Sequence, residues 1–167
     1  MAGIHRILAP VDFSSCSKQA LEHAVDLAER YFGASIDVLH VWEPPRPLGA
    51  DTALVSTNGT HASRQAAKVE ALTDMETLLA EHDAKGIVKF ARLHECGETV
   101  PTILEVARRG EYDLIVMGTH GRTGIAHEYL GSVAEKVVRR ACCPVLTVRE
   151  KERAPQKATA FAETAAT

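Results

Sequence analysis

The stretch DLIVM at residues 113–117 runs directly into the glycine-rich segment GTHGRTGIAHEYLG at residues 118–131, and together these two stretches decide the fold. Four consecutive apolar residues are typical of a strand that is buried on both faces of a parallel sheet. Behind the glycines, apolar residues recur at helical spacing over residues 132–141. A buried strand, a glycine-rich turn and a helix in this order indicate one unit of an α/β protein.

The rest of the chain repeats this alternation. Strand-like runs lie at residues 4–10, 36–41, 87–93 and 144–148, and helical periodicity fills residues 15–33, 61–85 and 101–110. Five strands interleaved with four helices predict an open, five-stranded, parallel, doubly wound sheet with helices on both faces. Ligands of such sheets bind at the carboxyl ends of the strands. We therefore expect residues 10–15, 40–43 and 118–131 to meet at that edge.

Composition limits the classes of function. The chain has 167 residues, a formal net charge of −3 and only 5% aromatic residues. No basic patch dominates, which argues against a nucleic-acid partner, and no apolar run reaches the ~18 residues of a membrane helix. Four cysteines without a Cys-x-x-Cys pattern indicate reduced thiols. We expect a cytoplasmic protein with no leader peptide, no membrane contact and no bound nucleic acid.

One domain is expected over residues 1–149. Within it, three prolines and two glycines at residues 43–59 predict a long loop. Residues 150–167 are charged at first and then rich in alanine and threonine, without a clear period. That composition predicts a disordered tail.

The glycine-rich segment carries the candidate chemistry. Glycines let backbone N–H groups approach an anion, and the positive end of a helix dipole lies where this segment ends. Ser132 has a hydroxyl for a phosphate oxygen, and Arg122 and Lys136 are nearby cations. The segment is neither a Walker A loop nor a Gly-x-Gly-x-x-Gly fingerprint. From the residues alone, two interpretations stay open: a phosphate site, or a closely packed turn that binds nothing.

Three separated segments resemble the universal stress protein family. The spacing Gly118-x2-Gly121-x9-Gly131-Ser132 is similar to that family's nucleotide-binding motif, and so are ILAPVDFSSCSKQAL at residues 7–21 and GSVAEKVVRRACCPVLTV from residue 131. The resemblance covers about residues 3–149. It implies a Rossmann-like fold of the adenine nucleotide alpha hydrolase-like type. Members with this glycine pattern bind ATP, and many form homodimers through the last strand, here Pro144–Val148.

The resemblance also implies roles for individual residues. Asp12 corresponds to the family's acidic residue near the ribose and the phosphate-bound metal, which makes it the candidate ligand of a Mg²⁺ ion carried in with ATP. The other implied nucleotide contacts are Pro10, Val11 and Val41 around the adenine, Met117, Gly118, Gly121, Arg122 and Thr123 along the turn, and Gly131, Ser132 and Val133 at the phosphates. Without a ligand, Asp12 would simply cap the first helix and Val41 would be core.

Other chemistry finds little support in the residues. The eight histidines show no zinc-binding spacing, even where His94 stands near Cys96, so we expect surface or capping histidines. The vicinal pair Cys142 and Cys143 is expected to be two buried thiols. No Gly-x-Ser-x-Gly elbow is present, and no catalytic residue is assigned.

Three hypotheses for function remain. The first is an ATP-binding protein of the stress response that acts as a nucleotide-dependent sensor or switch toward an unidentified protein partner. The second is a slow ATPase or an enzyme that phosphorylates itself, with Ser132 or Thr123 as acceptor. The third is a nucleotide-independent dimeric scaffold or chaperone-like protein, in which the apolar last strand pairs with a second copy.

Overall fold

Strands and helices alternate along the chain. The computed structural model describes residues 3–30, 33–44, 57–82, 88–121 and 130–150, and for residues 57–64 it describes the backbone only. The elements are β1 (Arg6–Pro10), α1 (Ser15–Arg30), β2 (Ser35–Trp42), α2 (Thr57–His82), β3 (Lys89–Cys96), α3 (Thr99–Arg109), β4 (Leu114–Gly118), α4 (Ser132–Arg140) and β5 (Val145–Val148). Most of the predicted loop, and the predicted tail from residue 151 onward, lie outside the described residues. Within the described part of the chain, no helix has the length and apolar character that a membrane span requires.

All five strands pair in parallel in the order β3-β2-β1-β4-β5. From β1 the chain moves outward to β2 and β3, and from β4 it moves outward to β5 in the opposite direction. The direction therefore reverses between β1 and β4. In doubly wound sheets, ligands bind at the carboxyl ends of the strands at this switch point. The predicted parallel, doubly wound sheet is confirmed.

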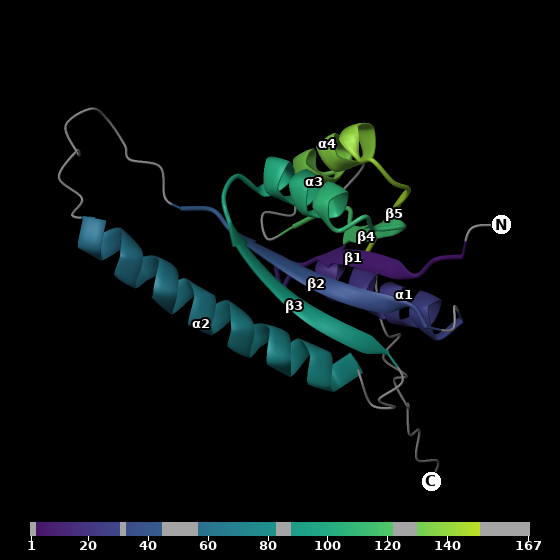
Figure 1. Cartoon of the computed structure of the whole chain (residues 1–167), viewed down its shortest axis with the longest axis horizontal. Coiled ribbons are helices and arrows are strands. Elements are labelled where there is room, and N and C mark those ends of the chain that lie inside the picture. The colour runs from purple at the N-terminus through teal and green to yellow at the C-terminus, as the bar shows by residue number, and fades with distance from the viewer. Residues whose placement is uncertain (1–2, 31–32, 45–56, 83–87, 122–129, 151–167) are drawn as a thin grey trace, which may run out of the picture.

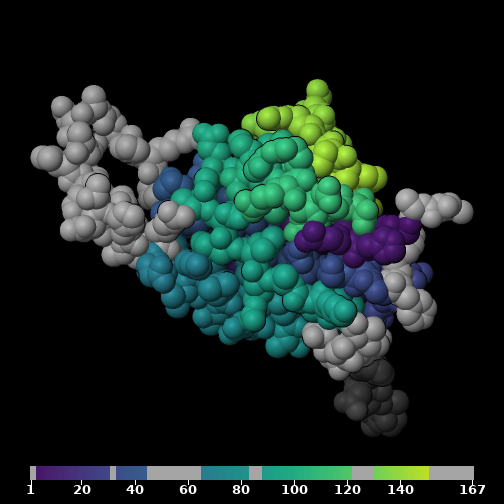
Figure 2. All heavy atoms as spheres, in the orientation of Figure 1, coloured from purple at the N-terminus to yellow at the C-terminus, as the bar shows by residue number. Residues whose placement is uncertain are grey.

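Helices cover both faces of the sheet, with α1 and α2 on one face and α3 and α4 on the other (Figure 1). Each pair of helices encloses its own hydrophobic core. The core under α1 and α2 contains Ile7, Leu21, Ile36, Val38 and Met75, and the core under α3 and α4 contains Leu8, Leu39, Ile103, Ile115 and Val137. The space-filling view shows the helices and strands packed together on the face in view (Figure 2). Right-handed crossovers account for this division of the helices.

Strand β4 links the two cores. Leu114 and Val116 lie in the core under α1 and α2, whereas Ile115 and Met117 lie in the core under α3 and α4. All four side chains are buried. The strand predicted from DLIVM is therefore confirmed, because successive side chains of a strand point to opposite faces and both faces here are covered by helices.

Two predicted boundaries are wrong by three residues each. Helix α2 begins at Thr57, so the last three residues of the predicted loop are helical. Gly59 does not prevent this, because a single glycine costs a helix only about 1 kcal/mol and the following residues continue it. Strand β3 extends to Cys96 instead of ending at residue 93. Its backbone pairs with β2 along all eight residues, so pairing, and not the run of apolar side chains, sets where this edge strand ends.

A polar cluster ties the amino ends of the strands together. Asp37 on β2 is buried, and its Oδ2 accepts hydrogen bonds from the Tyr112 hydroxyl at 2.5 Å and from Arg6 Nη2 at 2.9 Å. The Arg6 guanidinium also lies over the Tyr112 ring, 4.6 Å from its centroid. Burial, and then the bond to Asp37, raise the pKa of Tyr112 well above its usual value. The hydroxyl is therefore neutral and donates to Asp37 throughout the physiological range.

Candidate functional site

The turn from β1 into α1 is built around Asp12. The Val11 amide donates to the Leu39 carbonyl at 2.8 Å, which extends the β1–β2 pairing one residue past the strand. Oδ1 of Asp12 then accepts hydrogen bonds from the Ser14 amide at 3.1 Å and the Ser14 hydroxyl at 2.6 Å. The Ser14 hydroxyl oxygen accepts the Ser17 amide at 3.3 Å, so Ser14 is the residue that caps α1. Asp12 lies outside the helix and holds Ser14 in the capping position through Oδ1. Its second oxygen, Oδ2, points away from these bonds.

That second oxygen faces the glycine-rich turn. A Cβ placed on Gly121 would lie 2.6 Å from Asp12 Oδ2, which is closer than real Cβ atoms approach an oxygen. The carboxylate of the β1 turn and the second glycine of the β4 turn are therefore in direct contact. This is the meeting of strand ends expected at the switch point. Glycine at this position leaves the carboxylate in place and leaves backbone accessible beside it.

The other two glycines of the spacing allow close approach of backbone to backbone. A Cβ on Gly118 would lie 2.9 Å from Cys16 Sγ and 3.0 Å from the Cys16 carbonyl carbon, so Gly118 lets the first turn of α1 rest on β4. A Cβ on Gly131 would lie 2.5 Å from the Thr119 carbonyl oxygen. The packing role of these two glycines is therefore real and holds without any ligand.

Helix α4 begins beside this turn. Gly131 is its N-cap and supplies no side-chain cap, while the first amides of a helix have no partner within the helix. Ser132 is exposed at the first helical position and Lys136 is exposed one turn later. These amides, the hydroxyl and the dipole of α4 form a surface suited to an anion.

The remaining candidate residues contribute backbone. Pro10 ends β1, and its side chain, like those of Val11 and Met117, is buried. Val41 and Val133 pack against the core under α3 and α4. Any contact of Met117 or Val11 with a ligand would therefore come through main-chain atoms. Arg122 and Thr123 lie outside the described residues, so their position relative to the site is not described.

A row of three rings lies at the carboxyl ends of β1, β2 and β3. The Phe13 ring is 5.0 Å from the His40 ring, and the His40 ring is 5.3 Å from the His94 ring. Sequence reasoning missed this row. The signal lies in the strand register, in which His40 and His94 are direct neighbours although they are 54 residues apart.

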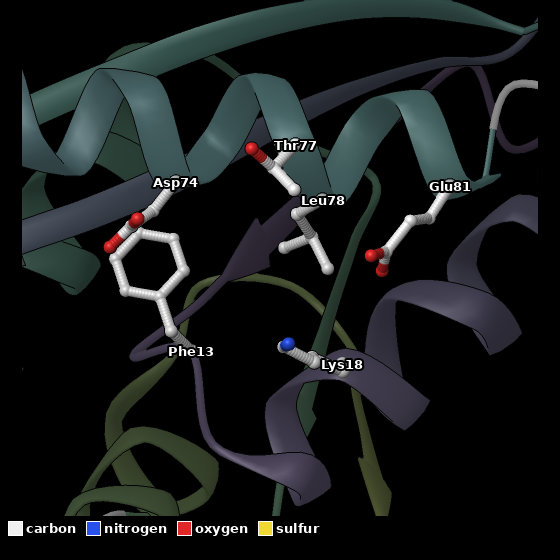
Figure 3. Close-up of a pocket in the computed structure, with 6 residues that line it drawn as sticks. All are labelled: Phe13, Lys18, Asp74, Thr77, Leu78 and Glu81. Atoms are coloured by element: carbon white, nitrogen blue, oxygen red, sulfur yellow. The ribbon is translucent and has the colours of Figure 1, made fainter.

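A pocket of about 240 Å³ lies between α1 and α2. Phe13, Lys18, Asp74, Thr77, Leu78 and Glu81 line it, and the Lys18 ammonium and the Glu81 carboxylate point into it (Figure 3). Its polar side chains are exposed, and none of the candidate nucleotide residues that the structure describes lines it. The pocket is therefore a groove separate from the site at the switch point, with Phe13 between the two.

The prediction of two buried vicinal thiols is wrong. Cys142 is exposed and Cys143 is only partly buried, because both lie in the short turn between α4 and β5 at the edge of the sheet. Burial, with the neighbouring Cys142 thiol, raises the pKa of Cys143 to about 11, which keeps it protonated and unreactive at neutral pH. The buried thiol is Cys16, whose Sγ donates to the Val148 carbonyl at 3.2 Å.

Comparison with known proteins gives a consistent result. Residues 3–149 match the profile of the Universal stress protein family. Universal stress protein MJ0531 of Methanocaldococcus jannaschii is 32% identical over 148 residues, which cover 89% of this chain and 84% of that protein. The structure of MJ0577 from the same organism superposes with a TM-score of 0.76 at 27% identity, covering 90% of this chain and 99% of that chain. A universal stress protein solved in complex with cAMP shares the fold, with a TM-score of 0.61 at 21% identity and coverage of 88% and 98%.

The fold and the sequence comparisons point to the same group of proteins. The five-stranded α/β fold matches the solved structures of MJ0577 and of a universal stress protein from Lactobacillus plantarum, at TM-scores of 0.76 and 0.71. Because the family profile matches from residue 3 to residue 149, the chain belongs to the universal stress protein family.

Proposed function

We propose that this protein binds ATP with Mg²⁺ at the carboxyl ends of β1 and β4, and that it acts as a nucleotide-dependent sensor or switch in the cytoplasmic stress response. The observation that carries the proposal is the contact between Asp12 and Gly121, with 2.6 Å between the carboxylate oxygen and a Cβ built on the glycine. It sets a carboxylate beside exposed glycine backbone. A relative of the same fold is described in complex with cAMP, which supports an adenine nucleotide as the class of ligand.

The residues present fit a magnesium nucleotide. Mg²⁺ prefers oxygen ligands and is held in proteins by one or two carboxylates together with the phosphates of its nucleotide. Asp12 would supply that carboxylate, since Oδ1 is held by Ser14 and Oδ2 faces the glycine turn. The amides of Ser132 and Val133 at the start of α4 would bind the phosphates. Main-chain atoms of Pro10, Val11 and Val41 would border the adenine, and Met117, Gly118, Gly121 and Arg122 the ribose and phosphates.

The proposed switching behaviour is explained by the position at which the nucleotide would bind. The site joins the start of α1, through Asp12 and Ser14, to the start of α4, through Gly131. Nucleotide bound between them would hold both helices in one arrangement, and a protein partner would recognise that arrangement. A ligand shifts such an equilibrium only as far as its affinity differs between the two arrangements.

We also propose that the protein is a homodimer formed through β5. This strand is at the end of the sheet order, so its outer edge has no neighbouring strand within the described part of the chain. Leu146 on β5 is 38% exposed, so a large apolar side chain stands on this strand where a partner could cover it. Pairing with β5 of a second copy about a two-fold axis would satisfy both edges.

The test is to identify the nucleotide that the protein carries. Freshly purified wild type and Asp12→Asn are denatured, and released small molecules are identified by mass spectrometry. The asparagine retains an oxygen for the Ser14 bonds but lacks the charge for Mg²⁺, so it is the matched variant. We expect adenine nucleotide from the wild type and at least tenfold less from Asp12→Asn.

Two other results would change the conclusion. An empty wild type that also shows no thermal shift with Mg-ATP would overturn the proposal in favour of the nucleotide-independent dimeric scaffold. Accumulation of ADP during incubation with Mg-ATP, in the wild type but not in Asp12→Asn, would make the protein a slow ATPase instead of a passive binder.

A further inference from the structure

Ser14 holds one oxygen of the Asp12 carboxylate with two donors. The Ser14 hydroxyl donates to Asp12 Oδ1 at 2.6 Å, and the Ser14 amide donates to the same oxygen at 3.1 Å. A carboxylate oxygen has two lone pairs with which it accepts hydrogen bonds. Ser14 therefore occupies both lone pairs of Oδ1, whereas Oδ2 faces Gly121.

Ser17 fixes the position of Ser14 from within α1. The buried Ser17 side chain donates its hydroxyl to the Ser14 carbonyl at 3.0 Å and accepts the Asp12 amide at 3.4 Å. The Ser17 amide donates to the Ser14 hydroxyl oxygen at 3.3 Å, so the one proton of that hydroxyl is directed to Asp12. Asp12, Ser14 and Ser17 thus form a closed network that fixes the orientation of the carboxylate.

We propose that Ser14 makes the site selective for ATP that carries Mg²⁺ over ATP that carries Ca²⁺. This specificity rests on the ATP site proposed above and deepens it by naming the metal ion that the site prefers. Ca²⁺ takes about six to eight oxygen ligands at about 2.3–2.6 Å and accepts both oxygens of one carboxylate. Mg²⁺ demands a near-ideal octahedron at about 2.0–2.1 Å, and the two oxygens of one carboxylate lie too close together for two of its corners.

The saturation of Oδ1 therefore distinguishes the two ions. With Oδ1 occupied by Ser14, Asp12 offers a cation Oδ2 alone. One carboxylate oxygen is sufficient for Mg²⁺, which obtains its other ligands from the phosphates and water. The same arrangement deprives Ca²⁺ of a bidentate ligand, so Ser14 acts as a positioning residue through Asp12.

Ser14 also caps α1, and its two roles have different consequences. Loss of the cap would loosen the start of α1, and it would weaken the binding of ATP by the same factor whichever ion the nucleotide carries. Loss of the hydroxyl bond opens one lone pair of Oδ1 to a cation, which helps Ca²⁺ more than Mg²⁺. The ratio of the two affinities therefore measures the positioning role separately from the cap.

The experiment is calorimetric titration of the whole protein with Mg-ATP and, separately, with Ca-ATP. In the wild type we expect Mg-ATP to bind about tenfold more tightly than Ca-ATP. Ser14→Ala keeps the amide bond to Oδ1 but lacks the hydroxyl, and it should reduce this preference to about threefold or less. Ser14→Gly also lacks the hydroxyl but weakens a helix cap little, so it should show the same reduced preference even if Ser14→Ala binds too weakly to measure.

Two further variants serve as controls. Ser14→Thr retains both the hydroxyl and a capping oxygen, so it should bind with the preference of the wild type. Ser15→Ala makes the same substitution at the neighbouring residue. The Ser15 side chain is exposed and forms no hydrogen bond with the residues that the structure describes, so this variant should also keep the preference.

The outcomes separate the metal specificity from ATP binding itself. A wild type that binds neither Mg-ATP nor Ca-ATP would overturn both the proposed function and the role of Ser14. A wild type that binds the two equally would overturn the role of Ser14 and leave ATP binding intact. So would a Ser14→Ala or Ser14→Gly that keeps the full preference of the wild type.

Discussion

The Gly131 amide donates a 2.8 Å hydrogen bond to the carbonyl oxygen of Thr119. Thr119 in turn donates its own amide to Val148 at 2.9 Å. The start of α4, the turn after β4 and the end of β5 are thus joined through consecutive main-chain bonds. The site at the switch point is therefore continuous with the edge strand that we propose as the dimer interface.

This contact predicts that Gly131→Ala destabilises the fold. The added Cβ would lie 2.5 Å from the Thr119 oxygen, a backbone atom that cannot move aside cheaply. We expect a loss of about 1–3 kcal/mol in the free energy of unfolding, as for other overpacked sites, measured by urea denaturation. Gly3→Ala is the matched control, because among the described residues its Cβ would meet only the flexible end of His5. Equal stability of the two variants would show that the contact is looser than described.

The Tyr112 hydroxyl should stabilise the fold through Asp37. Tyr112→Phe removes a donor from the buried Asp37 carboxylate, and Arg6 is then its remaining side-chain donor among the described residues. A bond to a charged, buried group is worth about 1.5–3 kcal/mol, and we expect a loss in that range by thermal or urea denaturation. Thr73→Val, which removes an exposed hydroxyl on α2, should change stability much less. If Tyr112→Phe is as stable as the wild type, Asp37 has found another partner.

The carboxylate of Asp113 should make stability depend on acid pH. Its Oδ2 accepts the amides of His5 at 2.8 Å and Arg6 at 2.9 Å, and these bonds lower the pKa of Asp113. A lowered pKa favours folding above the unfolded value of about 3.9, and that contribution is lost as the pH falls through the folded value.

We therefore expect Asp113→Asn to be less stable than the wild type at pH 7, by about 1 kcal/mol. The difference should narrow once the pH falls below the ordinary carboxyl pKa of about 3.9, and it should close only below the lowered pKa of the folded state. Unfolding curves between pH 3 and pH 7 measure it, with Asp26→Asn on the exposed face of α1 as control. A difference in stability that stays constant with pH would exclude the charge of Asp113 as its cause.

Leu146 tests the dimer. Replacing this exposed residue of β5 with glutamate would bring two like charges together at a symmetric strand pair, so Leu146→Glu should be monomeric. Light scattering after gel filtration at micromolar concentration measures the mass. Val69→Glu changes an exposed valine on α2, near the opposite edge of the sheet, and should leave a dimer. A dimeric Leu146→Glu, or a monomeric wild type, would contradict the proposed interface.

The sequence predicts the fold well where apolar side chains decide it. Leu114–Met117 is buried on both faces, as its composition indicates, and the carboxyl-end meeting of Asp12 and Gly121 follows from topology. Prediction fails where backbone pairing decides. The polar end of β3 belongs to the sheet only because it pairs with β2.

The candidate site shows the same division. Spacing singles out the three glycines but does not reveal that Gly118 and Gly131 are needed for packing. Nor does spacing reveal that Ser14 caps α1, because Asp12, Ser14 and Ser15 are all suitable capping residues. The neighbourhood of His40 and His94 depends on strand register, which no local pattern encodes.

Calorimetric titration of Mg-ATP into wild type, Gly121→Ala and Gly3→Ala tests the central claim most directly. Among the residues that the structure describes, the Cβ of Gly121→Ala meets only the Asp12 carboxylate, so we expect it to disturb the proposed ligand site more than the packing of the core. We predict that wild type and Gly3→Ala bind one ATP per chain with equal affinity, and that Gly121→Ala binds at least tenfold more weakly, about 1.4 kcal/mol. A wild type without binding, or a Gly121→Ala that binds as tightly as the wild type, would contradict the account.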